Sequence, residues 1–418
     1  MTQRDRPPDK NSAREAPCLR ADLEFIPVTY QGRKALIIKD SLGLVGEPLL
    51  LAGDGLLVLS LLGRRRSLKE LQAELVRLKG GAPLSMAKIE ALVDELESAY
   101  VLEGECYRLK KSRLEAEYAA LPVRPASHAG QAYPADPAEL ARFLDAALGL
   151  AGNVPSGFPA GSVSGIVAPH IDLEVGRRVY AQAYAAARGL KPKAVLLMGT
   201  GHSLDDSTVS LSEKDFETPL GVVRTDRTLV KRLRTAAGRA AAPTDFGHRQ
   251  EHSLEFQLLF LQHLFGSGFR LIPMLFGSLH KELSRAGRAG GLPSLSPVLE
   301  VMAEWLVRMG SEALVVAGVD FSHIGPKFGH RPAASVLRPE AERHDRLLID
   351  ALCRRDAEAF WGETRRVEDR FNVCGFSSLA CLLEILPPGP GRLLGYDFWL
   401  EEPTRSAVSF AGLAFGRA

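Results

Sequence analysis

The sequence predicts an α/β domain preceded by a small winged-helix-like α+β domain. Three observations lead to this prediction. The chain has 418 residues, which is long for a single ordinary domain. Its N-terminal part contains a hairpin pattern followed by amphipathic helical patterns, and from about residue 130 strand-like and helical runs alternate. We therefore expect a disordered N-terminus over 1–20, the small domain over 21–110, a linker over 111–130 and the α/β domain over 131–418.

The composition is that of a globular protein, with 46% hydrophobic and 24% charged residues. A net charge of +2 provides no overall field for attracting nucleic acid or an acidic membrane. The five cysteines lack CxxC spacing, which favours thiols in a reducing compartment. The N-terminal residues show no apolar signal-peptide core, and no run approaches the roughly 18 apolar residues that span a bilayer. We expect a cytoplasmic protein without membrane contact.

The small domain is predicted from local signals. Two strand-like runs flank Gln31-Gly32, which suits a hairpin turn. Ser67 and Glu70 form a capping box at the start of an amphipathic helix that the glycines at 80–81 end. A second amphipathic helix over 85–100 leads into a short strand. Hairpin, helices and strand indicate a winged-helix-like module, which also resembles the PqqD-like peptide-recognition domains.

DNA binding by this module is not expected. Its helix over 85–100 carries one lysine against four acidic residues, so its charge would repel phosphates in a major groove. The basic run 64–66 is short and typical of a solvated turn. A structural or protein-interaction role is favoured over nucleic-acid binding.

Polar residues follow several apolar runs in the second domain. His170 follows "SGIVAP", His202 follows "AVLLMGTG", and Asp320 and His323 follow "ALVVAGV", while "FRLIPMLF" ends at Gly277. In an open α/β sheet, ligands bind beyond the carboxyl ends of the strands, so these side chains are expected to share one crevice. A single histidine after a strand is more often a polar cap, but three at the same topological position favour a site.

Two further segments carry candidate residues. In "HRQEHSLEFQLLFLQHLF", Glu251, His252 and Glu255 lie in the first turn of a core-facing helix, where acidic residues also commonly serve as partners of the helix dipole. His248 and His252 form an i,i+4 pair without the HExxH signature of zinc proteases. In "VCGFSSLACLLEIL", Cys374 precedes a helix, a position that favours a thiolate.

Other chemistries lack their signatures. "GTGHSL" has no third glycine of a dinucleotide fingerprint, and neither a P-loop nor a GxSxG nucleophile elbow is present. Ser203, Ser253 and Ser322 each neighbour a histidine along the chain, but such adjacency does not constitute a catalytic triad.

Taken in order, several segments of the second domain resemble the Memo-like family, whose bacterial members are called AmmeMemoRadiSam system protein B. The matching segments span about residues 130 to 418 and are "QAYPADPAEL", "APHIDLEVG", "LMGTGHS", "ETPLGVVRTD", "EHSLEFQLLF", "GVDFSHIGPKFG" and "VCG". The resemblance implies a fold like that of the class III extradiol dioxygenases, which use a non-haem iron.

The same resemblance implies a set of site residues. His170, His202 and Cys374 would be the metal ligands, Asp320 and His323 would lie beside them, and Glu251 and His252 would also line the pocket. Iron is the expected metal, with copper and zinc as alternatives, because two imidazoles and a thiolate are borderline to soft ligands. The family name further implies a radical SAM enzyme and an AMMECR1-domain protein as partners.

Two departures from the family pattern limit what carries over. Where relatives read PHAGY, this chain has His170-Ile171-Asp172, so an aromatic wall of the pocket is expected to be absent. A cysteine also replaces the carboxylate of the dioxygenase triad. We therefore expect a metal-dependent oxidoreductase acting on an unknown small molecule or modified residue, with His323 as general acid or base held by Asp320. The alternative is a binding or scaffold protein that works with the two partners.

Overall fold

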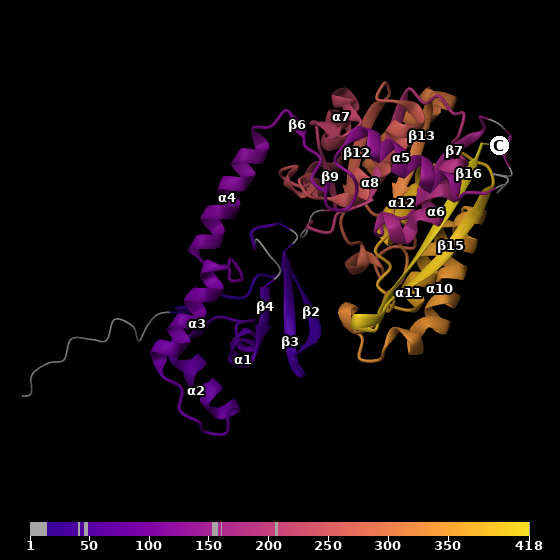
Figure 1. The fold of residues 1–418 in the computed structure, drawn as a ribbon. Helices are drawn as coiled ribbons and strands as arrows, with labels where there is room; N and C mark the ends of the chain where they lie inside the picture. The colour runs from indigo at the N-terminus through magenta and orange to yellow at the C-terminus, as the bar shows by residue number, and fades with distance from the viewer. Residues whose placement is uncertain are drawn as a thin grey trace, which may run out of the picture. The chain divides into compact units, whose positions relative to one another are not determined.

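The computed structural model describes residues 15–40, 42–45, 49–152, 158–159, 161–204 and 208–417. The chain forms two compact units, Met1–Tyr118 and Ala119–Ala418 (Figure 1). The boundary lies inside the range predicted as a linker, and the first part of that range belongs to helix α4, Glu105–Ala119. Among the described residues, no helix has the length and apolar character needed to cross a membrane.

The first unit contains a three-stranded antiparallel sheet, in the order β2 (Leu23–Tyr30), β3 (Arg33–Asp40) and β4 (Leu49–Ala52). Gln31 and Gly32 connect the first two strands with φ values of 49° and 73°. Two successive positive φ angles match the twist of a two-residue hairpin. The predicted hairpin and its turn are therefore confirmed.

Helices form the rest of the first unit: α1 (Asp54–Leu61), α2 (Leu68–Leu78), α3 (Met86–Ser98) and α4, with the short strands β1 (Glu15–Ala16) and β5 (Arg66–Ser67) paired to each other. The capping box is present, because Ser67 accepts the amide hydrogen of Glu70 and the Glu70 carboxylate accepts that of Ser67. After α3, where a short strand was predicted, the chain makes one isolated bridge between Leu19 and Leu102 before α4 begins.

The predicted disordered segment 1–20 falls partly outside the described residues, which begin at 15. Residues 15–20 belong to the folded module. The Arg20 guanidinium is completely buried and forms hydrogen bonds with the carboxylates of Asp22 and Asp40. A buried arginine paired with two carboxylates ties this part of the N-terminus to the β-hairpin.

The second unit is built on an eleven-stranded mixed sheet. Four strands at its centre, in the order β12-β8-β13-β7, are parallel, and β16 joins β7 in antiparallel orientation. The strands are β6 (Val123–Arg124), β7 (Val163–Ala168), β8 (Ala194–Thr200), β9 (Val209–Leu211), β10 (Asp215–Thr218), β11 (Gly221–Thr225), β12 (Arg270–Phe276), β13 (Ala313–Gly318), β14 (His323–Ile324), β15 (Gly391–Glu401) and β16 (Ser406–Gly416).

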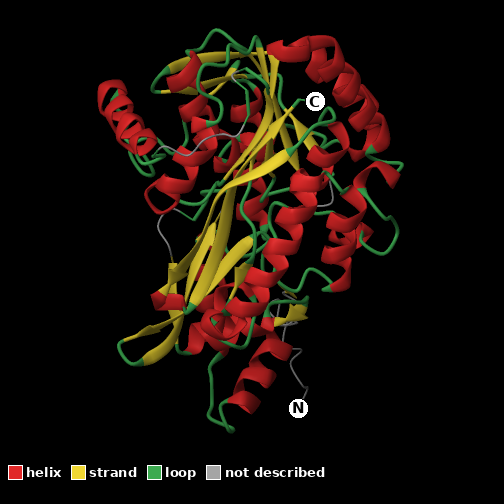
Figure 2. Cartoon of the chain, turned by 90° about the vertical axis from the view of Figure 1, so that its right-hand side faces the viewer, coloured by secondary structure: helices red, strands yellow, loops and turns green. Residues whose placement is uncertain are grey.

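Both faces of the central strands are buried. Alternate residues of β8 belong to different cores: Leu196 and Met198 to one, Val195 and Leu197 to the other. Figure 2 shows the sheet's strands (yellow) beside helices (red). The helices of the second unit are α5 (Pro137–Gly149), α6 (Leu173–Ala185), α7 (Arg227–Ala237), α8 (His252–Phe265), α9 (Ser296–Met309), α10 (Ala334–Arg354), α11 (Ala357–Arg366) and α12 (Phe376–Ile385). The continuous apolar strands typical of a parallel sheet covered on both sides confirm the predicted α/β fold class.

Candidate metal centre

Three parallel strands deliver the polar residues of the site to one edge of the sheet. β7 ends two residues before His170, β8 ends two residues before His202, and β13 ends two residues before Asp320. Because β7, β13 and β8 are neighbours and run in the same direction, their carboxyl ends meet at this edge. The three residues therefore lie together at this edge: His170 and His202 belong to one group of closely spaced donor atoms, and Nε2 of His170 lies 3.6 Å from Oδ2 of Asp320.

His170 is buried and fixed by two backbone contacts. Its Nδ1 lies 3.0 Å from the carbonyl oxygen of Gly318, so Nδ1 carries the hydrogen and Nε2 presents a lone pair. Its own amide donates to Asp320 at 2.9 Å. Burial, reinforced by the neighbouring His202, lowers the pKa of His170 to about 3. A neutral imidazole with a preset tautomer is the form that binds a metal ion.

His202 is oriented by Glu251, the residue that caps α8. Its Nδ1 lies 3.1 Å from both carboxylate oxygens of Glu251, and its amide donates to the same group at 3.1 Å. Although burial opposes it, Glu251 raises the pKa of His202 well above its usual value, while the pKa of Glu251 falls well below its own. A carboxylate behind a histidine is the arrangement that fixes and strengthens metal-ligating imidazoles.

His252, the first residue of α8, lies with these two histidines. One ring nitrogen each from His170, His202 and His252 falls within a set whose members are all within 4.8 Å of one another. The His252 and His202 rings are stacked, with centroids 5.0 Å apart. The family resemblance implied that His252 lines the pocket beside the ligands, and the structure places it among the donor atoms. The side chains of His202 and His252 are 37% and 34% exposed, so the cluster is open to solvent.

Cys374 lies next to this cluster but outside it, so the closely spaced donor set contains His252 where the predicted ligand set had Cys374. Its Sγ lies 3.3 Å from Nε2 of His170, and its carbonyl oxygen accepts the hydroxyl of Thr200. α12 begins two residues later, as predicted. However, burial raises the pKa of the Cys374 thiol, opposite to the expected effect of the helix N-terminus. A metal ion would bind Cys374 as the thiolate, so its binding would release the thiol proton.

Asp320 and His323 lie beside the cluster, but their relationship differs from the predicted hydrogen bond. Oδ1 of Asp320 accepts the amides of His170 and Ile171 at 2.9 and 3.3 Å, and burial raises the pKa of Asp320 to about 6. Nδ1 of His323 lies 3.0 Å from the carbonyl oxygen of Phe321. The tautomer of His323 is therefore set by a backbone carbonyl, while Oδ1 of Asp320 holds the turn that carries His170 and its Oδ2 lies 3.6 Å from Nε2 of His170.

Glu255 has a structural role that sequence analysis did not assign. It is fully buried and accepts hydrogen bonds from Arg124, Tyr133 and Ser127, as well as from the amide of His128 at 2.9 Å. Although burial opposes ionisation, Arg124 lowers the pKa of Glu255 to about 2. This network ties residues 124–133, part of which was predicted to be a linker, to the helix that carries His252.

His128 is the site residue that the sequence did not reveal. Its ring lies edge-on to that of His252 at 6.0 Å, and its Nε2 lies 3.0 Å from the carbonyl oxygen of Gln250. It lies four residues after the two-residue strand β6, within the range predicted as a linker, and no local sequence signal distinguished it. Beside His323, the ring of Phe328 stands perpendicular to the imidazole, with ring centroids 4.9 Å apart.

The fold and the site together define an α/β protein with a cluster of three histidines, whose donor atoms are close enough to share one ion, at the carboxyl edge of a parallel sheet. The model of the Memo-like protein family matches residues 124–414. The chain belongs to this family.

Several relatives have sequences similar to that of this chain. A MEMO1 family protein of Aquifex aeolicus is 28% identical over 400 residues, covering 95% of this chain and 100% of the relative. MEMO1 family protein TTHA0924 of Thermus thermophilus is 28% identical, covering 82% and 97%. A MEMO1 family protein of Aeropyrum pernix is 30% identical over 65% of this chain and 89% of its own length. The Aquifex match extends into the N-terminal unit.

Proposed function

We propose that this protein is a metal-dependent oxidoreductase acting on a small molecule or a modified residue. The observation that supports the proposal is the convergence of three imidazoles, with the Cys374 thiol 3.3 Å from His170, at a solvent-accessible edge of the sheet. His170, His202 and Cys374 would be the ligands, with His252 as a fourth donor. This donor set fits a borderline or soft transition metal; we propose iron, with copper and zinc as the alternatives. Such an ion, when bound, supplies Lewis-acid or one-electron chemistry to a substrate.

Residues around the proposed ligands would orient them and transfer protons. Glu251 orients His202, and Asp320 orients the turn of His170. His323 donates its Nδ1 hydrogen to Phe321, so the neutral ring keeps Nε2 as a proton acceptor. Burial lowers the pKa of His323 against the attraction of Asp320, which favours this neutral form at pH 7. We assign His323 the transfer of a proton to and from the substrate.

Anaerobic purification followed by metal analysis tests the proposal. The full chain should carry close to one equivalent of iron, copper or zinc, and the metal-loaded form should be screened for oxidation of candidate substrates. His170→Ala should purify without the metal, whereas His263→Ala, in a surface histidine paired with Asp145, should retain it. A folded parent protein that binds none of these metals contradicts the proposal.

A scaffold function is the second candidate, because the N-terminal unit has its own core and contributes none of the proposed ligands. In this case the chain would bind the radical SAM enzyme and the AMMECR1-domain protein in the cytoplasm. Co-purification of tagged protein with both partners from cells, abolished by deletion of the N-terminal unit and unaffected by His170→Ala, would favour this function over catalysis.

A further inference from the structure

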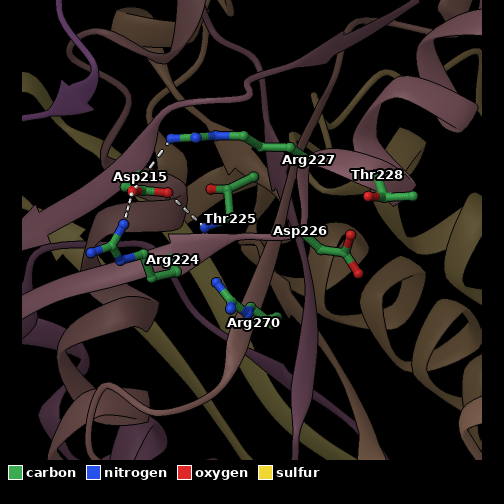
Figure 3. A pocket seen from close by; sticks show the side chains of 7 residues that line it. All are labelled: Asp215, Arg224, Thr225, Asp226, Arg227, Thr228 and Arg270. Carbon is green, nitrogen blue, oxygen red and sulfur yellow. Dashed lines mark hydrogen bonds and ion pairs between the residues drawn. The ribbon is translucent and has the colours of Figure 1, made fainter.

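A second cluster of charged side chains lies away from the histidines, at a hollow of about 370 Å³ in the second unit (Figure 3). Its lining residues are Asp215, Arg224, Thr225, Asp226, Arg227, Thr228 and Arg270. Arg270 is the first residue of β12, and the metal edge lies beyond the last, Phe276. At about 3.3 Å per residue the two places are roughly 20 Å apart, so the hollow is separate from the candidate metal centre.

Three arginines from three different elements converge on this hollow. Arg224 lies on β11, Arg227 begins α7, and Arg270 begins β12. Arg224 and Arg270 are also register partners on adjacent strands. Like charges directly opposite each other destabilise a sheet. The pair is therefore costly unless an anion lies between the two guanidinium groups.

The anion already present balances this charge only in part. Asp215 is buried and accepts the amide of Thr225 at 3.0 Å. Its other oxygen is 3.6 Å from Arg224 and 3.5 Å from Arg227 (dashed in Figure 3). Charge-assisted hydrogen bonds are about 2.7–2.9 Å long, so both guanidinium groups retain donors for another acceptor. Among the described residues, the Arg270 guanidinium has no hydrogen-bond or ion-pair partner.

We propose that this hollow binds a phosphate group, carried by a small organic phosphate or as the free ion. Guanidinium groups match phosphate oxygens geometrically, and the first turn of α7, where Arg227 and Thr228 lie, adds the positive end of a helix dipole. Asp226 also lines the hollow and its carboxylate caps the same helix at the amide of Leu229, so three arginines face two carboxylates and the lining retains a net positive charge. The volume lies in the range of small-ligand pockets. The proposal does not depend on the metal centre.

Calorimetric titration of the full, metal-free chain tests the site with two probes, inorganic phosphate and glycerol 3-phosphate, at constant ionic strength. Saturable one-site binding is expected for at least one probe. Arg270→Ala should weaken it by about 10- to 100-fold, the size of a lost hydrogen bond to a charged group. Arg346→Ala, which removes an exposed arginine of α10, should leave the affinity unchanged. Tighter binding of the ester identifies an organic phosphate; equal or tighter binding of inorganic phosphate identifies the free ion.

Asp215→Asn provides the opposite test. Removing the internal carboxylate while keeping its shape should strengthen phosphate binding, whereas a purely structural Asp215–arginine cluster would show no gain. Arg224→Ala serves as the second variant if Arg270→Ala does not fold, as judged from its thermal melt. Absence of saturable binding by the parent protein, or an unchanged affinity in the arginine variants, overturns the proposal.

Discussion

The carboxylate of Glu251 lies 3.1 Å, through both oxygens, from Nδ1 of His202, and it also caps the helix that begins with His252. One residue thus fixes the tautomer of one proposed ligand and the backbone position of another. Carboxylates behind metal-bound histidines commonly contribute 10- to 100-fold in metal affinity.

Glu251→Gln is expected to weaken metal binding by about 10- to 100-fold without unfolding the protein, because the amide cannot hold His202 as an anion does. Competition with a chelator of known affinity measures the change. Asp145→Asn is the matched control, since Asp145 pairs with His263 at the surface, 2.8 Å away. An unchanged affinity in Glu251→Gln would show that His202 is not a ligand.

Cys374→Ser is expected to weaken binding of a soft metal and to abolish the sulfur-to-metal charge-transfer absorption of the Cu(II) or Co(II) form, because serine offers no thiolate. Cys381→Ser is the control, since Cys381 lies in the apolar core of α12 and its pKa is raised by burial. Retention of the absorption band in Cys374→Ser would remove the cysteine from the ligand set.

His323→Ala is expected to keep the fold and most of the metal but to lose turnover by about 10²- to 10⁴-fold, the usual contribution of a general acid or base. His170→Ala should lose metal and turnover together. Metal content and rate are measured on both variants with the same substrate. If His323→Ala is also emptied of metal, His323 is a ligand; if its rate matches that of the parent, it transfers no proton.

Two N-terminal truncations should show which part of the predicted linker 111–130 the second unit needs for its stability. A chain of residues 119–418 is expected to fold and bind metal at the full-length stoichiometry, because the N-terminal unit supplies no proposed ligand. A chain of residues 131–418 loses Arg124, Ser127 and His128 and leaves Glu255 buried without its ion-pair partner. Breaking a buried pair in this way costs about 3–5 kcal/mol. Equal thermal stability of the two chains would contradict the role given to this network.

Acid stability should depend on Glu255. Its pKa in the folded protein is lowered to about 2, below the unfolded value, so its stabilising contribution is complete above about pH 4.3 and is lost as the pH falls toward 2. The contribution is on the order of 3 kcal/mol at most. Glu255→Gln should reduce the loss of unfolding free energy between about pH 4.3 and pH 2.

The three tryptophans, Trp305, Trp361 and Trp399, all lie in the second unit, so fluorescence during denaturant unfolding reports on that unit alone. If the unfolding free energy of Glu255→Gln fell with acid as steeply as that of the parent, the pH dependence would belong to other carboxylates.

Local sequence determined most of the elements. Turn conformation, capping and burial periodicity are short-range effects, so a few neighbouring residues encode each of these features. They include the Gln31-Gly32 turn, the Ser67–Glu70 capping box and the apolar strands that end before His170, His202 and Asp320. The direction of parallel strands then brings their carboxyl ends together, so the meeting of these three residues at one edge of the sheet could be predicted as well.

Tertiary structure decided which atoms meet in that crevice. Asp320 lies only three residues before His323. Its Oδ1 nevertheless accepts the amides of His170 and Ile171, and His170 is 150 residues away along the chain. His128 and Arg124 reach the site only because Glu255, more than 120 residues later, is buried against them. Hydrogen bonds of this kind depend on which segments pack together, and a buried carboxylate takes the donors that the packed fold supplies, whatever their distance along the sequence.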